Sequence, residues 1–139
     1  CLLYTQKYPG DIEGIVLLAP FLGEGLLEKE LQTSGGLANW HYQPGSGKDE
    51  QDRKVREIWF WLQQYFDPAI QPTPDEGKPR IWLGWGSRDK FRGDAARLAA
   101  IMPADQSLTI DGAHDWPTWA KLFGQFIPEL GLPPTGAQP

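Results

Sequence analysis

The chain has 139 residues, which suits a single domain, and 40% of them are hydrophobic, including 7 Trp, which is enough to build a packed core. The formal net charge of −5 argues against nucleic acid and anionic lipid as partners. No apolar run approaches the length of about 18 residues that spans a bilayer, and a single Cys excludes an internal disulfide and a multi-cysteine metal site.

The first stretch predicts a helix that leads into a buried strand. Residues 1–8 carry apolar side chains at near-helical spacing, and Pro9 with Gly10 ends this run. Residues 14–20 form a short, continuous apolar segment closed by a Pro, the pattern of a strand buried on both faces of a parallel sheet. Because the sequence starts in the middle of a helix, we expect further chain upstream of Cys1.

Residues 22–78 predict a mainly helical insertion. A short helix is expected over residues 26–31 and a long amphipathic helix over residues 49–66. The apolar stripe of the long helix consists of Val55, Ile58, Trp59, Leu62, Tyr65 and Phe66. Pro68, Pro72, Pro74 and Pro79 mark an extended linker to the next strand. An insertion of this size between two buried strands indicates a cap or lid.

The remaining chain alternates strands with helices. We expect a strand over residues 81–86, a helix from Asp94 as N-cap to residue 102, a strand from residue 107, and a helix over residues 116–130. The last helix is expected to bury Trp119, Leu122, Phe123, Phe126 and Ile127. Residues 131–139 are rich in Pro and Gly and predict a flexible tail. The alternation predicts an α/β fold with a parallel sheet covered on both faces.

Asp89 and His114 each follow a predicted strand, and they are the candidate catalytic residues. The carboxyl ends of parallel strands meet at one edge of a sheet, where ligands bind in open α/β folds. A carboxylate that orients an imidazole, which then acts as general base, makes two of the three members of a nucleophile triad. Asp94, Asp111 and Asp115 are the alternative acids. Asp89 is preferred because the acid must approach from a neighbouring strand.

These segments resemble the C-terminal part of an α/β-hydrolase of the serine esterase type. Residues 2–20 resemble the helix after the nucleophile elbow and the strand that follows it. The Gly86-Ser-Arg-Asp89 and Gly112-Ala-His114 segments resemble the loops that carry the triad acid and the triad His. The resemblance covers residues 1–21 and 78–130, and the residues between them match only as a variable cap. It implies that residues 1–139 are the C-terminal part of one α/β-hydrolase domain, with Asp89 as acid and His114 as base.

The elbow that would carry the nucleophile is absent from the sequence. No Gly-x-Ser-x-Gly occurs, and none of the four serines, Ser34, Ser46, Ser87 and Ser107, has that context. The resemblance therefore implies a Ser and oxyanion-hole amides upstream of Cys1, in a parent protein that hydrolyses a carboxylic ester or another acyl bond without a cofactor. We expect these 139 residues alone to be inactive.

Two other functions stay open at this point. The chain is alternatively a non-catalytic α/β module used for binding, either a degenerate hydrolase or one half of a two-chain assembly. In that case the missing N-terminal part or a dimer partner would cover the open edge of the strand at residues 14–20. A lyase or haloalkane-type reaction on the same scaffold is a third option, because a fold does not fix its chemistry.

Other residues are weaker candidates. Phe21, Trp59 and Trp116 are expected to contact a small-molecule ester substrate, although the aromatic residues of the helix over residues 49–66 also suit simple packing, and Trp116 also suits a plug against the core. His41 suits a surface or packing role. Cys1 is either an N-terminal nucleophile or, as we prefer, a buried helix cysteine.

The sequence predicts no metal site and no dinucleotide site, because it lacks a His-Glu-x-x-His motif and a Gly-x-Gly-x-x-Gly motif. The single Cys favours a cytoplasmic location. The chain does not begin with Met, so removal of a signal peptide stays open and the sequence does not decide the compartment.

Overall fold

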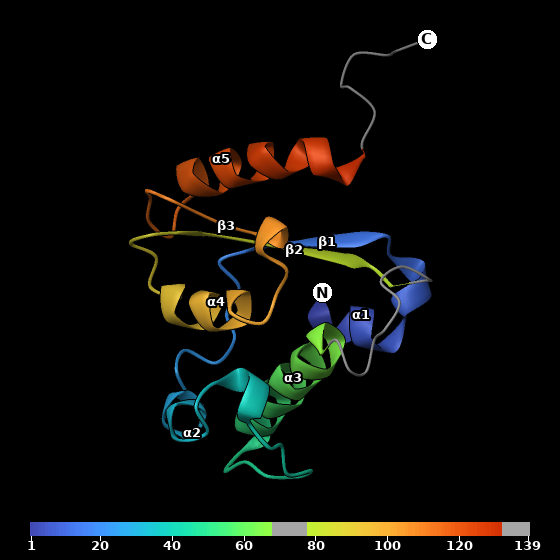
Figure 1. Cartoon of the computed structure of the whole chain (residues 1–139), viewed down its shortest axis with the longest axis vertical. Coiled ribbons are helices and arrows are strands. Elements are labelled where there is room, and N and C mark those ends of the chain that lie inside the picture. Colours follow the sequence, from blue (N-terminus) through green and yellow to red (C-terminus); the bar gives the residue numbers. More distant parts are fainter. Residues whose placement is uncertain (68–77, 132–139) are drawn as a thin grey trace.

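Three apolar segments form the strands of one parallel sheet in a computed structural model that describes residues 1–67 and 78–131. The strands lie in the order β1 (Gly14–Leu18), β2 (Arg80–Gly86), β3 (Ser107–Ile110). The described residues also form five α-helices: α1 (Leu2–Lys7), α2 (Glu28–Thr33), α3 (Glu50–Phe66), α4 (Arg92–Ala99) and α5 (Trp116–Phe126) (Figure 1). The mixed α/β class and the parallel sheet predicted from the sequence are therefore confirmed.

Helices cover both faces of the sheet. Figure 1 shows α5 on one face and α1 with α4 on the other, while α2 and α3 lie beyond α1 and α4. The absence of a side chain at Gly84 lets α5 approach the sheet, since a Cβ there would lie 3.0 Å from both Leu122 and Phe126. On the opposite face, Leu17 and Leu83 are neighbours in the register of β1 and β2, and both belong to the main hydrophobic core.

The helices of the insertion share that core with the sheet. Asp49 caps α3, because its side chain accepts a hydrogen bond of 2.8 Å from the backbone N–H of Asp52. The apolar stripe of α3 then turns Val55, Trp59 and Leu62 inward, where they join the same cluster of buried residues as the sheet. Hydrophobic burial therefore fixes the insertion against the α/β layers.

Two helix predictions were partly wrong. Helix α4 begins at Arg92 and is flanked by Phe91, so Asp94 is not its N-cap. Asp94 lies in the first turn with 5% of its surface exposed, and it accepts hydrogen bonds from the backbone N–H of Gly25 (3.3 Å) and from Arg97 (2.9 Å). A long-range backbone partner recruits this carboxylate, and the sequence around it cannot reveal that partner.

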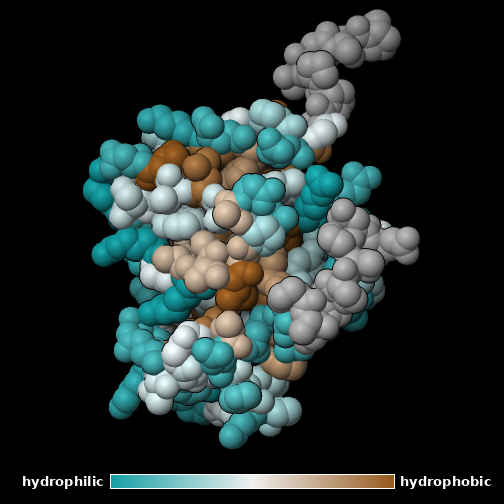
Figure 2. All heavy atoms as spheres, in the orientation of Figure 1, coloured by the Kyte–Doolittle hydropathy of each residue, from teal (hydrophilic) through white to brown (hydrophobic). Residues whose placement is uncertain are grey.

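The last helix also differs from its prediction. Helix α5 ends at Phe126 and continues as a 3-10 turn over Ile127–Leu130, because Pro128 has no N–H to donate within an α-helix. Phe123 (41% exposed) and Ile127 (42% exposed) are not buried as predicted. Apolar side chains reach the surface along α5 in Figure 2. The prolines at 68, 72 and 74 and residues 132–139 of the predicted tail lie outside the described residues.

Candidate active site

The loops after β2 and β3 remain hydrogen-bonded to each other beyond the ends of the strands. The backbone N–H of Ser87 donates to the carbonyl of Ile110, and that of Arg88 donates to the carbonyl of Gly112, both at 2.8 Å. The N–H of Asp89 turns back to the carbonyl of Gly86 at 2.9 Å. This pairing holds the loop of Asp89 beside the loop that leads to His114.

The close approach of the two loops requires glycine. A Cβ placed on Gly86 would lie 2.6 Å from the carbonyl carbon of Gly112 and 3.0 Å from the carbonyl oxygen of Ala113. These are backbone atoms that cannot move aside as a flexible side chain can. The glycine at the end of β2 therefore allows the loop of His114 to lie against the loop of Asp89.

The structure brings Asp89 and His114 into direct hydrogen-bonding contact. Nδ1 of His114 lies 2.9 Å from Oδ2 and 3.1 Å from Oδ1 of Asp89. The side chain of Asp89 is fully buried, and that of His114 is 28% exposed. An ionised carboxylate only accepts hydrogen bonds, so it assigns the proton to Nδ1 and leaves the lone pair of Nε2 free to accept one. That is the tautomer that a general base needs.

Two aromatic rings enclose the imidazole. The ring of Phe91 lies edge-on to His114 with 4.9 Å between centroids, and the indole of Trp119 does the same at 4.8 Å. Further rings pack on these two, because Phe21 packs on Phe91 (5.6 Å) and Trp116 packs on Trp119 (5.3 Å). These four side chains and the imidazole form one aromatic row. The imidazole therefore sits in a fixed apolar setting with one side open to solvent.

The alternative acids have other partners. Asp111 is exposed and pairs with Arg88, and Asp115 caps α5 by accepting 2.9 Å from the backbone N–H of Thr118. Hydrogen bonds from Thr118 hold the pKa of Asp115 below its ordinary value, and burial raises the pKa of Asp94. Of the four candidate carboxylates, Asp89 is the one that contacts His114.

The three residues predicted to contact substrate differ in their exposure to solvent. Phe21 (48% exposed) and Trp116 (77% exposed) belong to the aromatic row, so Trp116 does not plug the core. Trp59 is 1% exposed and lies in the core, where its indole N–H donates 2.8 Å to the carbonyl of Leu22. Trp59 therefore presents no surface to a ligand. The aromatic stripe of α3 packs against the core, as the simpler alternative held.

None of the serines is bonded to His114 in the described part of the chain. Ser34 donates to the carbonyl of Glu30, Ser87 donates to Asp111 (3.3 Å), and Ser107 begins β3 at the end away from His114. The fourth, Ser46, has a buried hydroxyl without a partner. Cys1 is exposed, which corrects the expectation of a buried helix cysteine.

A pocket elsewhere on the protein is lined by a His, a Ser and an Asp, but these three residues do not form the hydrogen bonds of a catalytic triad. It has a volume of about 440 Å³ and is lined in part by His41, Ser46 and Asp52. His41 is exposed. The carboxylate of Asp52 is already bound to the backbone N–H of Lys48 (3.0 Å) and to Arg56 (2.9 Å). Asp52 therefore orients α3 and its preceding loop, and the pocket holds no acid–base relay.

The ring contacts of Phe91 and Trp119 with His114 were not predicted from the sequence. An Asp often accepts from the backbone N–H two residues later, as Asp89 does from Phe91 at 2.8 Å, so the sequence could have indicated the contact with Asp89 but not the ring contact with His114. Trp119 lies within the first turns of α5, and its contact with His114 depends on how that helix leaves the loop. No sequence signal marks that angle.

No protein-family model, no curated protein and no solved structure matches this chain. Among the described residues, none of the helices has both the length and the apolar character needed to cross a membrane. The same residues contain no group of three or more His, Cys, Asp or Glu placed to hold a metal ion.

Proposed function

We propose that the chain supplies the acid and the base of a serine hydrolase that acts on carboxylic esters, as the C-terminal part of an α/β-hydrolase fold. The observation that carries the proposal is the buried Asp89 carboxylate bound to Nδ1 of His114 at the carboxyl edge of a parallel sheet. The chain order, with acid before base on successive strands and an insertion ahead of both, suits that family.

In this proposal His114 moves the proton and Asp89 orients the ring. As the serine oxygen bonds to the ester carbonyl carbon, its proton passes to Nε2, and the carboxylate of Asp89 stabilises the resulting imidazolium. The imidazolium then gives this proton to the leaving alcohol oxygen as the C–O bond breaks. A water molecule repeats both steps on the acyl-enzyme and releases the carboxylic acid.

The serine itself is proposed to lie upstream of Cys1, where the resemblance puts the nucleophile elbow. The four serines of the described residues support this placement because none of them bonds to His114. Two experiments follow. The first is to read the coding sequence upstream of Cys1 and to express the extended protein. We expect a Gly-x-Ser-x-Gly segment after a buried strand, and hydrolysis of p-nitrophenyl acetate by the extended protein.

The second experiment compares the extended protein and its variants with the 139-residue chain on that ester. His114→Ala in the extended protein is expected to lower kcat by at least about 10³-fold, as is replacement of the upstream Ser by Ala. The 139-residue chain is expected to show no turnover. Turnover by that chain that disappears in its His114→Ala variant would contradict an upstream nucleophile, and an extended protein without a serine elbow would contradict the serine mechanism.

A second function, a non-catalytic binding module, is favoured by one observation. Strand β1 forms an edge of the described sheet, and its residues Gly14–Leu18 carry no charge that would discourage pairing with another strand. Light scattering distinguishes this option. A mass that rises with protein concentration supports association through the edge, and a monomer at all concentrations argues against it.

A further inference from the structure

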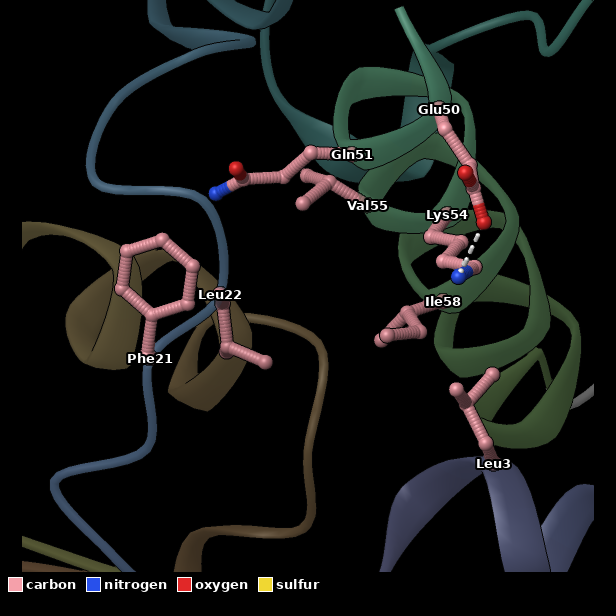
Figure 3. A pocket seen from close by; sticks show the side chains of 8 residues that line it. All are labelled: Leu3, Phe21, Leu22, Glu50, Gln51, Lys54, Val55 and Ile58. Carbon is pink, nitrogen blue, oxygen red and sulfur yellow. Dashed lines mark hydrogen bonds and ion pairs between the residues drawn. The ribbon is translucent and has the colours of Figure 1, made fainter.

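A groove of about 490 Å³ lies between α1, the loop after β1 and α3 (Figure 3). Its volume is within the range of small-molecule sites. Five of its lining residues are apolar and come from all three elements: Leu3, Phe21, Leu22, Val55 and Ile58. Figure 3 shows these side chains around a shared open space, with Leu3 facing Ile58 and Leu22 facing the side of α3.

The groove carries no uncompensated charge. Its two charged residues, Glu50 and Lys54, form an ion pair of 2.6 Å one helical turn apart on α3, and its remaining polar residue, Gln51, is neutral. A charged ligand would therefore lose hydration without gaining a free partner. The lining favours an uncharged, apolar occupant.

The walls of the groove are held in place from behind. The indole N–H of Trp59 donates to the carbonyl of Leu22 inside the core. Gly23 has a φ of +105°, and a Cβ on it would lie 2.6 Å from Cγ1 of Val55, so the backbone of the loop lies directly against α3. The groove is thus formed before a ligand arrives, which lowers the entropy cost of binding.

One residue joins the groove to the candidate active site. Phe21 lines the groove, and its ring packs on Phe91, which packs on His114. We propose that this groove binds the apolar part of a neutral carboxylic ester, and that Phe21 is the side chain that selects it. The term ester rests on the proposed function, whereas binding of a neutral apolar group to the groove does not.

The test is a titration of methyl-labelled 139-residue protein with 2-octanone, a neutral ketone that is not hydrolysed, followed by two-dimensional NMR. Saturating shifts are expected at the methyl groups of Leu3, Leu22, Val55 and Ile58. Phe21→Ala should weaken binding about fivefold. Phe123→Ala is the matched control, since Phe123 is 41% exposed against 48% for Phe21 and lies on α5, and it should change the Kd less than twofold. Octanoate should bind more weakly than the ketone.

The proposal would be overturned by the absence of shifts at the groove methyl groups, by equal effects of the two Phe variants, or by tighter binding of octanoate than of the ketone. Shifts at these methyl groups that grow with protein concentration alone would also overturn it, because a second copy would then occupy the groove. Binding without hydrolysis by the extended protein would reject the proposed function and keep the groove. Hydrolysis by the extended protein without shifts at these methyl groups would reject the groove as the binding site and keep the proposed function.

Discussion

The ring of Phe91 lies edge-on to the imidazole of His114, with 4.9 Å between centroids and 87° between the planes. The backbone N–H of the same residue donates 2.8 Å to Oδ1 of Asp89. Phe91 therefore contacts both Asp89 and His114, since its ring packs against the imidazole and its backbone N–H binds the carboxylate. The backbone contact survives any substitution other than Pro, so the side-chain contact can be tested separately.

A double-mutant cycle between Phe91→Ala and His114→Ala should reveal a coupling of about 1 kcal/mol in the free energy of unfolding, because edge-to-face ring pairs contribute about 0.5–1.5 kcal/mol beyond their burial. Urea denaturation of the four proteins measures it. The comparison cycle pairs His114→Ala with Phe123→Ala, whose ring makes no aromatic contact in the described residues, and should give a coupling near zero. Equal couplings in the two cycles would contradict the contact.

Asp89→Asn should reverse the tautomer of His114. The amide oxygen of Asn can keep the hydrogen bond from the backbone N–H of Phe91. The NH₂ group then points toward Nδ1 of His114, so that this nitrogen becomes the acceptor. The ring proton would move to Nε2, where a general base needs a lone pair. Nitrogen-15 NMR of the imidazole identifies the protonated nitrogen.

Asp111→Asn is the control for this experiment. Asp111 lies three residues before His114, is exposed, and pairs with Arg88, so its replacement should leave the proton on Nδ1. A wild-type protein with the proton on Nε2 would contradict the geometry of the pair, and so would an Asp89→Asn variant that keeps it on Nδ1.

Gly86→Ala should destabilise the protein by about 2 kcal/mol or more, since its Cβ would enter the backbone of Gly112 and force the loops of Asp89 and His114 apart. Gly124→Ala provides a matched control. Gly124 lies in α5, where an added Cβ would meet no atom within 4 Å apart from the neighbouring backbone of its own helix, and Ala there should stabilise the helix by about 0.5–1 kcal/mol. Thermal unfolding of both variants measures the difference, and effects of the same sign would refute the argument.

A helix or strand could be predicted from the sequence where the spacing of its own apolar residues is sufficient to identify it. The apolar run that became β1 and the stripe of α3 needed only local periodicity, and Asp89 with His114 needed only the rule that parallel strands end at one edge. Prediction from the sequence fails where a residue far away in the chain determines the contacts of a side chain. Asp94 is recruited by the backbone of Gly25, so a plausible local N-cap became a buried long-range link.

The role of Trp59 was hidden for the same reason. Its spacing on α3 is equally consistent with a pocket wall and with a core residue, and its partner, the carbonyl of Leu22, lies 37 positions earlier in the sequence. The contact of Trp119 with His114 depends on the direction in which α5 leaves its loop. Periodicity within one helix contains no information on such a direction.

Trp59→Phe should cost about 2–3 kcal/mol of unfolding free energy, because it leaves the buried carbonyl of Leu22 without its donor and creates a small cavity. Trp61→Phe is the control. Trp61 is partly buried, and its indole N–H makes no hydrogen bond within the described residues, so its loss should cost less than about 1 kcal/mol. Urea denaturation distinguishes the two variants, and equal losses would show that ring volume alone matters.

Asp52→Asn should lower stability at neutral pH, and the loss should disappear in acid. The side chain of Asp52 is 2% exposed, and the backbone N–H of Lys48, with the guanidinium of Arg56, holds the pKa of this carboxyl below its ordinary value. Asn must turn its NH₂ group toward one of these two donors, which should cost about 2 kcal/mol at pH 7. The stabilisation by Asp52 is present above the ordinary Asp pKa of about 3.9 and is lost as the pH falls through the lower folded-state value.

The difference in unfolding free energy between wild type and Asp52→Asn should therefore be constant from pH 7 to about 5 and shrink below about 4. Urea denaturation at a series of pH values measures it. Asp105→Asn, at an exposed position that forms no hydrogen bond or ion pair among the described residues, should show a difference near zero throughout. A difference for Asp52→Asn that persists or grows in acid would mean that the carboxylate is not held in its charged form by Lys48 and Arg56.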